Sequence, residues 1–113
     1  MTTEEELPKS IIVHIDRFSL NKELQLDAFQ EFKELCLASG TEVCAEITGK
    51  IDRPSPTYFV KRGKLEEIKK LVIKNKTNLV IFNNDLSPSQ ERNLEKYLGA
   101  RVLDRTALIL DIF

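Results

Sequence analysis

The chain has 113 residues, with 17 lysines and arginines against 18 aspartates and glutamates and a formal net charge of −1. This length fits one domain, the 42% apolar content argues against disorder, and no apolar run approaches the roughly 20 residues of a membrane span. The acidic start MTTEEEL is not expected to be a secretory signal, and two cysteines are too few for a disulfide framework or a four-ligand zinc site. We therefore expect a reducing, cytoplasmic compartment and no membrane partner.

The first predicted elements are a strand and a helix. Residues 1–10 are polar and are expected to form a flexible N-terminus. Residues 11–15 (IIVHI) are a continuous β-branched run, which is typical of a strand buried on both faces of a parallel sheet. A helix is predicted from residue 21 or 22 to residue 39, before Gly40. Its buried face is expected to hold Phe29, Phe32 and Cys36.

The middle of the chain predicts a second strand, a loop and a basic helix. Residues 42–48 (EVCAEIT) alternate as a strand, residues 49–56 form a proline-containing loop, and residues 57–60 (TYFV) a short extended stub. The strand's apolar face is expected to hold Val43, Ala45 and Ile47. A helix is then predicted from Gly63 to about Lys76. Its lysines on or near the wet side are Lys69, Lys70, Lys74 and Lys76.

The last third of the chain carries the clearest local signals. Residues 78–82 (NLVIF) predict a buried strand, and Ser87–Gln90 (SPSQ) predicts a capping box at the start of a helix that ends before Gly99. Residues 101–103 predict a last strand, after which Asp104 caps another helix. This order predicts an α/β fold with a small, mostly parallel β-sheet of about four strands flanked by helices, and with the start of a further helix at the C-terminus.

The final helix has no stop signal, because the chain ends in the apolar sequence LILDIF. We expect it to begin a helical subdomain of a longer protein. The predicted organisation is therefore a flexible segment over 1–10, an α/β domain over 11–104 and the start of the helical subdomain over 105–113.

Sequence motifs for catalysis are missing from the chain. The Gly-Lys pair of Arg62–Leu65 lacks both the upstream glycine and the hydroxyl residue of a phosphate-binding P-loop. The one histidine, His14, lies inside an apolar strand, where a hydrogen-bonded structural histidine is a better interpretation than an acid or base. We expect no catalytic residue, no cofactor site and no metal ligand in these 113 residues.

Positive charge is concentrated in one segment. Residues 1–49 carry a net charge of −6, residues 50–76 of +6 and residues 77–113 of −1. Basic loop residues beside an aromatic ring suit phosphate contact and base stacking. The predicted RNA-binding residues are Arg53, Tyr58, Lys61, Arg62 and Lys64. The alternative is a solvated lysine-rich helix with the aromatic side chains in the core.

A second, smaller basic pair is Arg92 and Lys96. Glu91 and Glu95 flank it, so a mixed, solvated helix face is the better interpretation.

Four segments together resemble the N-terminal domain of HflX-type GTPases. They are EITGK (46–50), YFVKRGKLEEI (58–68), NNDLSPSQERNLEKYL (83–98) and VLDRTALILDIF (102–113). The resemblance implies a cytoplasmic factor that binds the large ribosomal subunit and its rRNA and splits stalled or stressed ribosomes. It also implies a GTPase domain beyond this chain, with GTP and Mg²⁺ bound there and none bound here; the chain alone is expected to be a monomer. The family's usual Gly-x-Gly-Lys turn has Lys61 in place of its first glycine, which weakens any phosphate-cradling role.

Three other interpretations stay open. One is a nucleotide (ATP)-binding α/β module with its ligand at the carboxyl ends of the strands, near Asp16–Arg17 and Asn83–Asp85. Another is a different RNA-binding domain, because RGKLEEIKK, LVIFNND and SP loosely resemble the kink-turn-binding ribosomal protein fold. The last is a regulatory domain that only packs on its own GTPase domain.

Overall fold

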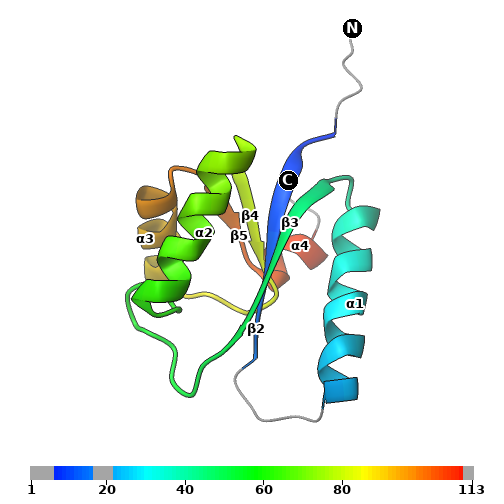
Figure 1. Cartoon of the computed structure of the whole chain (residues 1–113), viewed down its shortest axis with the longest axis horizontal. Coiled ribbons are helices and arrows are strands. Elements are labelled where there is room, and N and C mark those ends of the chain that lie inside the picture. The colour runs from blue at the N-terminus through cyan, green and yellow to red at the C-terminus, as the bar shows by residue number, and fades with distance from the viewer. Residues whose placement is uncertain (1–6, 17–21, 111–113) are drawn as a thin grey trace, which may run out of the picture.

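The chain forms a four-stranded sheet with helices on both faces. A computed structural model describes residues 7–16 and 22–110. The strands are β2 (Lys9–Asp16), β3 (Glu42–Lys50), β4 (Leu79–Phe82) and β5 (Arg101–Leu103). The helices are α1 (Lys22–Ala38), α2 (Arg62–Asn75), α3 (Pro88–Leu98) and α4 (Arg105–Ile109). The strand order is β3-β2-β4-β5 with every pair parallel, which confirms the predicted α/β fold (Figure 1).

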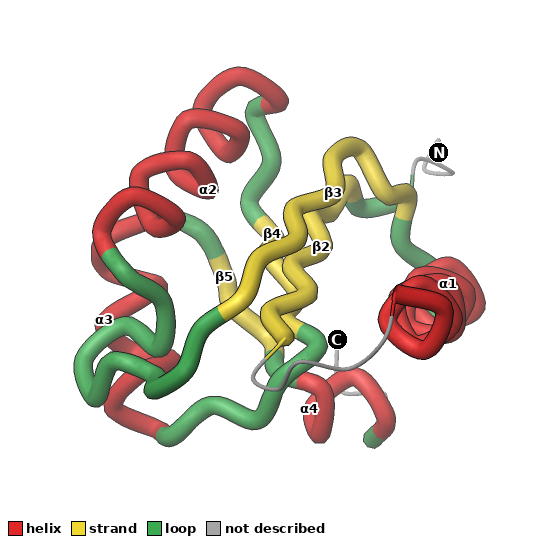
Figure 2. The backbone as a smooth tube through the Cα atoms, turned by 60° about the horizontal axis from the view of Figure 1, so that its bottom comes forward, coloured by secondary structure: helices red, strands yellow, loops and turns green. Residues whose placement is uncertain are grey.

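The sheet separates two hydrophobic layers. Figure 2 shows α2 and α3 on one side of the strands and α1 and α4 on the other. Along β2, Ile11, Val13 and Ile15 pack in the α2–α3 layer, whereas Ile12 packs with Phe32 in the α1–α4 layer. The continuous β-branched run was therefore a sound signal of a strand buried on both faces.

Strand β2 begins at Lys9, two residues before the predicted start. Ser10 is fully buried, and its hydroxyl shares a 2.9 Å hydrogen bond with the Thr41 hydroxyl. This partner lies 31 residues away along the chain, so the polarity of residues 9–10 alone suggested a flexible end. Residues 1–6 of the predicted flexible segment and residues 111–113 of the last helix lie outside the described residues.

The predicted alternation of β3 is wrong at one point. The register between β2 and β3 shifts between Ser10 and Ile11, which leaves Cys44 as an extra residue in β3. Val43 consequently packs in the α1–α4 layer, while Ala45 packs in the α2–α3 layer. A β-bulge of this kind reverses the facing of every residue before it relative to those after it.

The predicted extended stub over 57–60 is also wrong, because the chain reverses there. Ser55 and Phe59 exchange two backbone hydrogen bonds of 3.0 and 2.9 Å in an isolated antiparallel bridge. Phe59 adopts a left-handed backbone with φ of 66°, and its ring is buried edge-on against Phe82 with centroids 6.4 Å apart. We call residues 55–59 the Ser55–Phe59 turn.

The helix signals agree with the structure. Ser87 accepts a hydrogen bond from the Gln90 amide and the Gln90 side chain accepts one from the Ser87 amide, which confirms the capping box. Gly99 ends α3 in the left-handed conformation, and the Asp104 carboxylate caps α4 through the Ala107 amide. Within the described part of the chain, no helix has the length and apolar content to cross a membrane.

Candidate functional site

The Ser55–Phe59 turn is held against the start of α3. The Gln90 side-chain amide donates a 2.7 Å hydrogen bond to the Ser55 carbonyl, and the Asn93 amide donates a 3.1 Å bond to the Thr57 carbonyl. Gln90 is buried and uses its other amide atom, Oε1, for the capping box. The sequence predicted the capping box of Gln90 but not its hydrogen bond to the Ser55 carbonyl. The available signal was the choice of glutamine over glutamate, since only an amide offers a donor as well as an acceptor.

Two tyrosines meet between this turn and α3. Tyr58 and Tyr97 are half-buried, with ring centroids 5.8 Å apart and planes at 61°. From α2, the Lys69 ammonium lies 4.5 Å from the centre of the Tyr97 ring and donates a 2.9 Å hydrogen bond to the Tyr97 carbonyl. Lys69 is therefore part of the packing between α2 and α3, whereas the sequence placed it on or near the wet side. Tyr97 was not predicted as a site residue.

The tyrosines form the wall of an open groove of about 420 Å³, which we call the tyrosine groove. It combines two buried apolar side chains, Val60 and Leu65, with two exposed cations, Lys61 and Arg62, which we call its mouth. The residues that line it are Ser55, Tyr58, Val60, Lys61, Arg62, Leu65 and Tyr97. Three of the five predicted RNA-binding residues, Tyr58, Lys61 and Arg62, thus come together here.

Lys61 and Arg62 present their charges to solvent. Lys61 is exposed and precedes α2 with φ of −80° and ψ of 168°, an extended backbone that any residue adopts. Lysine is therefore accommodated at this position without strain. The Arg62 side chain is 90% exposed and pairs with Glu66 at 3.3 Å. An exposed pair of this kind is worth only ~0.3–0.5 kcal/mol, so it leaves Arg62 available to a phosphate.

The other two predicted cations behave differently. The Lys64 ammonium donates a 2.9 Å hydrogen bond to the Thr48 carbonyl and pairs with Glu67 at 3.0 Å, and its side chain is only 27% exposed. It links α2 to β3. Arg53 is exposed in the loop that leads to the Ser55–Phe59 turn.

The second basic pair lies on a mixed-charge surface. Arg92 and Lys96 are exposed on α3, and Arg92 borders an open hollow of about 440 Å³ together with Glu91 and Glu95. Burial and the neighbouring Asp104 and Glu95 carboxylates raise the pKa of Glu91. The Glu91 and Glu95 carboxylates thus lie beside this pair, and the interpretation of Arg92 and Lys96 as part of a mixed, solvated face stays a prediction.

The Arg62–Leu65 segment is not arranged as a phosphate-binding P-loop. The lysine of the Arg62–Leu65 segment that would have to reach a phosphate, Lys64, is bonded to Thr48 and Glu67. Among residues 7–16 and 22–110, no group of three or more His, Cys, Asp or Glu side chains is placed to hold a metal ion.

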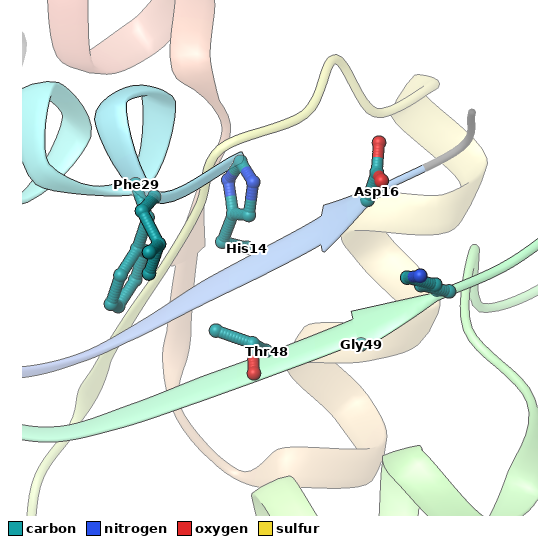
Figure 3. Close-up of a pocket in the computed structure, with 7 residues that line it drawn as sticks. His14, Asp16, Phe29, Thr48 and Gly49 are labelled. Atoms are coloured by element: carbon teal, nitrogen blue, oxygen red, sulfur yellow. The ribbon is translucent and has the colours of Figure 1, made fainter. Parts of the chain in front are cut away.

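A separate cavity of about 400 Å³ lies near the carboxyl ends of β2 and β3 (Figure 3). Its residues are His14, Asp16, Thr48, Gly49 and Lys50 of the two strands and Leu26 and Phe29 of α1. The His14 and Phe29 rings lie with centroids 5.6 Å apart.

His14 is held by hydrogen bonding, as the structural interpretation of this residue predicts. Its Nδ1 accepts a 2.7 Å bond from the Asn83 amide, and Asn83 Oδ1 in turn accepts a bond from Arg105. Desolvation by burial lowers the pKa of His14, Asp16 opposes this, and Arg105 adds to it. The Asn84 amide binds both backbone groups of Ile15. The polar side chains after β4 thus fasten strands and helices together, while Arg17 lies outside the described residues.

Comparison with known proteins shows which family this chain belongs to. Residues 26–113 match the family described as GTP-binding GTPase N-terminal. The GTPase HflX of Escherichia coli (strain K12) is 44% identical over 105 residues, covering 93% of this chain and 24% of that protein. The GTPase HflX of Flavobacterium psychrophilum is 38% identical over 105 residues, covering 93% of this chain and 25% of that protein. The chain thus spans about a quarter of the length of these curated relatives.

Solved structures share the fold. The crystal structure of SsGBP with GDP superposes with a TM-score of 0.67 at 23% identity, covering 92% of this chain and 28% of that one. A GTP-binding protein from the archaeon Sulfolobus solfataricus in complex with GDP gives a TM-score of 0.66 at 23% identity, covering 92% of this chain and 30% of that one. The family match and the HflX relatives together supersede the loose kink-turn resemblance. The chain belongs to the GTP-binding GTPase N-terminal family, as the N-terminal domain of a HflX-type GTPase.

Proposed function

We propose that this chain is the ribosome-binding and regulatory domain of a GTPase that associates with the large ribosomal subunit and splits stalled or stressed ribosomes in the cytoplasm. In this proposal the domain contacts rRNA and packs near its own GTPase domain. In this proposal GTP and Mg²⁺ are bound and GTP is hydrolysed outside these residues. The contact of Lys64 with the Thr48 carbonyl supports this, because it occupies the lysine that a P-loop would turn toward phosphate. The nucleotide state of that domain would set the affinity for the ribosome.

The observation that carries the RNA contact is the exposed pair Lys61–Arg62 at the mouth of the tyrosine groove. Phosphates are bound by exposed cations, and RNA-binding modules place such cations beside aromatic side chains. Of the predicted basic residues, these two combine exposure with a neighbouring aromatic ring. Lys64 stabilises the neighbouring backbone, because its hydrogen bond to the Thr48 carbonyl links the first turn of α2 to β3.

The test is binding of the chain to purified large ribosomal subunits across a salt series. Each phosphate contact steepens the fall of log affinity with log salt by ~0.7–0.9, so loss of two contacts flattens the slope by about 1.5. The double variant K61E/R62E is expected to weaken binding and flatten this slope. The matched control is K70E/K74E, which makes the same charge change at exposed positions of the same helix. Affinity that does not fall as salt rises, or equal losses in both double variants, would count against this surface.

A second candidate function is binding of a nucleotide such as ATP in the cavity near the carboxyl ends of β2 and β3. The observation in its favour is the cavity itself, at about 400 Å³ and with Lys50 among its residues, in the place where open α/β sheets bind ligands. Equilibrium dialysis of the chain against ATP and GTP tests it. Binding that is lost in Lys50→Ala and kept in Lys70→Ala would support this function, and absence of binding by the original chain would reject it.

A further inference from the structure

We propose that the tyrosine groove takes up a single unpaired RNA base, which stacks on Tyr58 while Lys61 and Arg62 contact the adjoining phosphates. This inference rests on the proposed RNA-binding function and goes beyond it by naming the form of RNA that the groove selects. The groove would distinguish a bulged, looped or terminal nucleotide from a paired one.

The first argument is the arrangement of the rings. Tyr58 and Tyr97 meet at 61° with centroids 5.8 Å apart, so the edge of one ring lies against the other and the pair does not stack in parallel. The Lys69 ammonium already lies over the Tyr97 ring at 4.5 Å from its centre. We therefore assign the base to the face of Tyr58 that is turned away from Tyr97. An aromatic side chain of this kind contributes ~1–3 kcal/mol per stacked base.

The second argument is size and accessibility. At about 420 Å³ the groove lies near the lower end of the ~300–1,000 Å³ range of small-ligand sites, which suits one base better than an extended ligand. Bases inside a duplex are stacked on their neighbours and cannot enter such a groove. A base must therefore be unpaired to reach Tyr58.

The third argument is the chemistry of the lining. Val60 and Leu65 are buried and apolar, and the Ser55 hydroxyl oxygen already accepts hydrogen bonds from the Thr57 and Tyr58 amides at 3.2 and 3.3 Å. The Ser55 hydroxyl is thus already used within the turn, and the other polar groups of the lining are the two tyrosine hydroxyls and the Lys61 and Arg62 cations, which this proposal assigns to phosphates. The groove is expected to accept different bases with similar affinity, as stacking sites do.

The fourth argument is rigidity. Tyr58 precedes Phe59, whose ring is 3% exposed and whose backbone is fixed in a left-handed conformation. Gln90 and Asn93 hold the same turn from α3. The stacking ring is therefore presented in place before the RNA arrives, which reduces the entropy lost on binding.

The chain offers a direct optical test. It contains two tyrosines and no tryptophan, so its intrinsic fluorescence comes from Tyr58 and Tyr97 alone. A short mixed-sequence single-stranded RNA is titrated into the chain, and the same strand annealed to its complement serves as the paired probe. We expect the single strand to quench the tyrosine fluorescence and to bind more tightly than the duplex.

Variants of Tyr58 then separate stacking from packing. Tyr58→Leu keeps apolar bulk in the turn and removes the ring, and it is expected to weaken single-strand binding by about 5- to 150-fold with little effect on the duplex. Tyr58→Phe keeps a ring and is expected to retain near-original affinity. Circular dichroism spectra confirm that each variant is folded before its affinity is measured.

The outcomes distinguish the inference from the function on which it rests. Salt-dependent binding of both RNAs with equal affinity, unchanged in Tyr58→Leu, would overturn the base-stacking groove and leave rRNA binding intact. Binding of neither RNA nor the large subunit would overturn both. Quenching by the single strand that persists at full strength in Tyr58→Leu would also overturn the assignment to Tyr58.

Discussion

The left-handed backbone of Phe59 predicts that glycine is more stable than alanine at this position, which is the reverse of the order expected at ordinary buried positions. Phe59 has φ of 66° and a ring that is 3% exposed. A side chain in this conformation costs ~1–2 kcal/mol, and truncating a buried phenylalanine to alanine costs ~3–5 kcal/mol. Phe59→Ala therefore loses the buried ring and keeps the backbone strain. Phe59→Gly loses the ring and releases the strain.

Glycine ordinarily destabilises a folded chain by ~0.5–1 kcal/mol relative to alanine, because it loses more backbone entropy on folding. At Phe59 the released strain exceeds that loss, so we expect Phe59→Gly to be more stable than Phe59→Ala by about 0.5–1 kcal/mol. Phe82 is the matched control, because it is the ring partner of Phe59, is fully buried and lies in β4. There Phe82→Gly is expected to be less stable than Phe82→Ala by a similar amount.

The measurement is the free energy of unfolding in urea, followed by far-ultraviolet circular dichroism for all four variants. Where a variant is unfolded in water, the glycine and alanine forms are compared at one fixed sucrose concentration, which favours the compact state of both. If Phe59→Gly is the less stable of its pair, the left-handed backbone is not a source of strain. The hold of Gln90 and Asn93 on the turn would be unaffected by that result.

Three further results are expected. Ser87→Ala removes the α3 cap and should lower the free energy of unfolding by ~1 kcal/mol, whereas Ser89→Ala at an exposed position should leave it nearly unchanged. Burial lowers the pKa of His14 below its ordinary 6.5, so the unfolded chain binds this proton more strongly and stability should fall as the pH drops below about 6.5. An NMR titration of this single histidine should show the lowered pKa, and an unshifted pKa would refute the predicted loss of stability. Burial raises the pKa of Cys36 to about 12, so a thiol reagent should modify Cys44 first, and Cys44→Ser should abolish the fast phase.

The sequence predicted correctly the features that depend on residues close together in the chain, such as helix caps. The capping box of Ser87–Gln90 and the left-handed Gly99 were predicted because their partners lie within four residues, where sequence spacing fixes geometry. The apolar run of residues 11–15 predicted burial on two faces for a similar reason. The order of the strands had no such signal, since β2 lies between β3 and β4 only once crossovers are formed.

The rest depends on contacts between distant residues. Gln90 bonds Ser55 across 35 positions, and Tyr58 meets Tyr97 across the same turn-to-helix contact. The bulge at Cys44 is defined by how β3 pairs with β2, since the register shifts between Ser10 and Ile11. The sequence of β3 alone does not show this shift. Lys61, Arg62 and Tyr58 of the tyrosine groove could be predicted from the sequence, whereas Tyr97 could not.

The structure also changes what the basic segment means. The net charge of +6 over residues 50–76 counts every lysine equally. Lys64 and Lys69 donate hydrogen bonds to the carbonyls of Thr48 and Tyr97, and these bonds link α2 to β3 and to α3. Lys64 and Lys69 therefore stabilise the packing of α2, whereas Lys61 and Arg62 are exposed to solvent in the tyrosine groove.

Lys61 shows why that division matters. Its backbone is extended, with φ of −80°, so the position does not require glycine, and a cation fits at the mouth of the groove without strain. Glycine and lysine both offer a backbone amide at this position, but only lysine adds a side-chain cation that can reach a phosphate. Exchange of Lys61 for glycine should therefore weaken binding to an RNA backbone while leaving the fold unchanged. Within the proposed function, Lys61 is thus the cation of this turn that contacts an RNA phosphate.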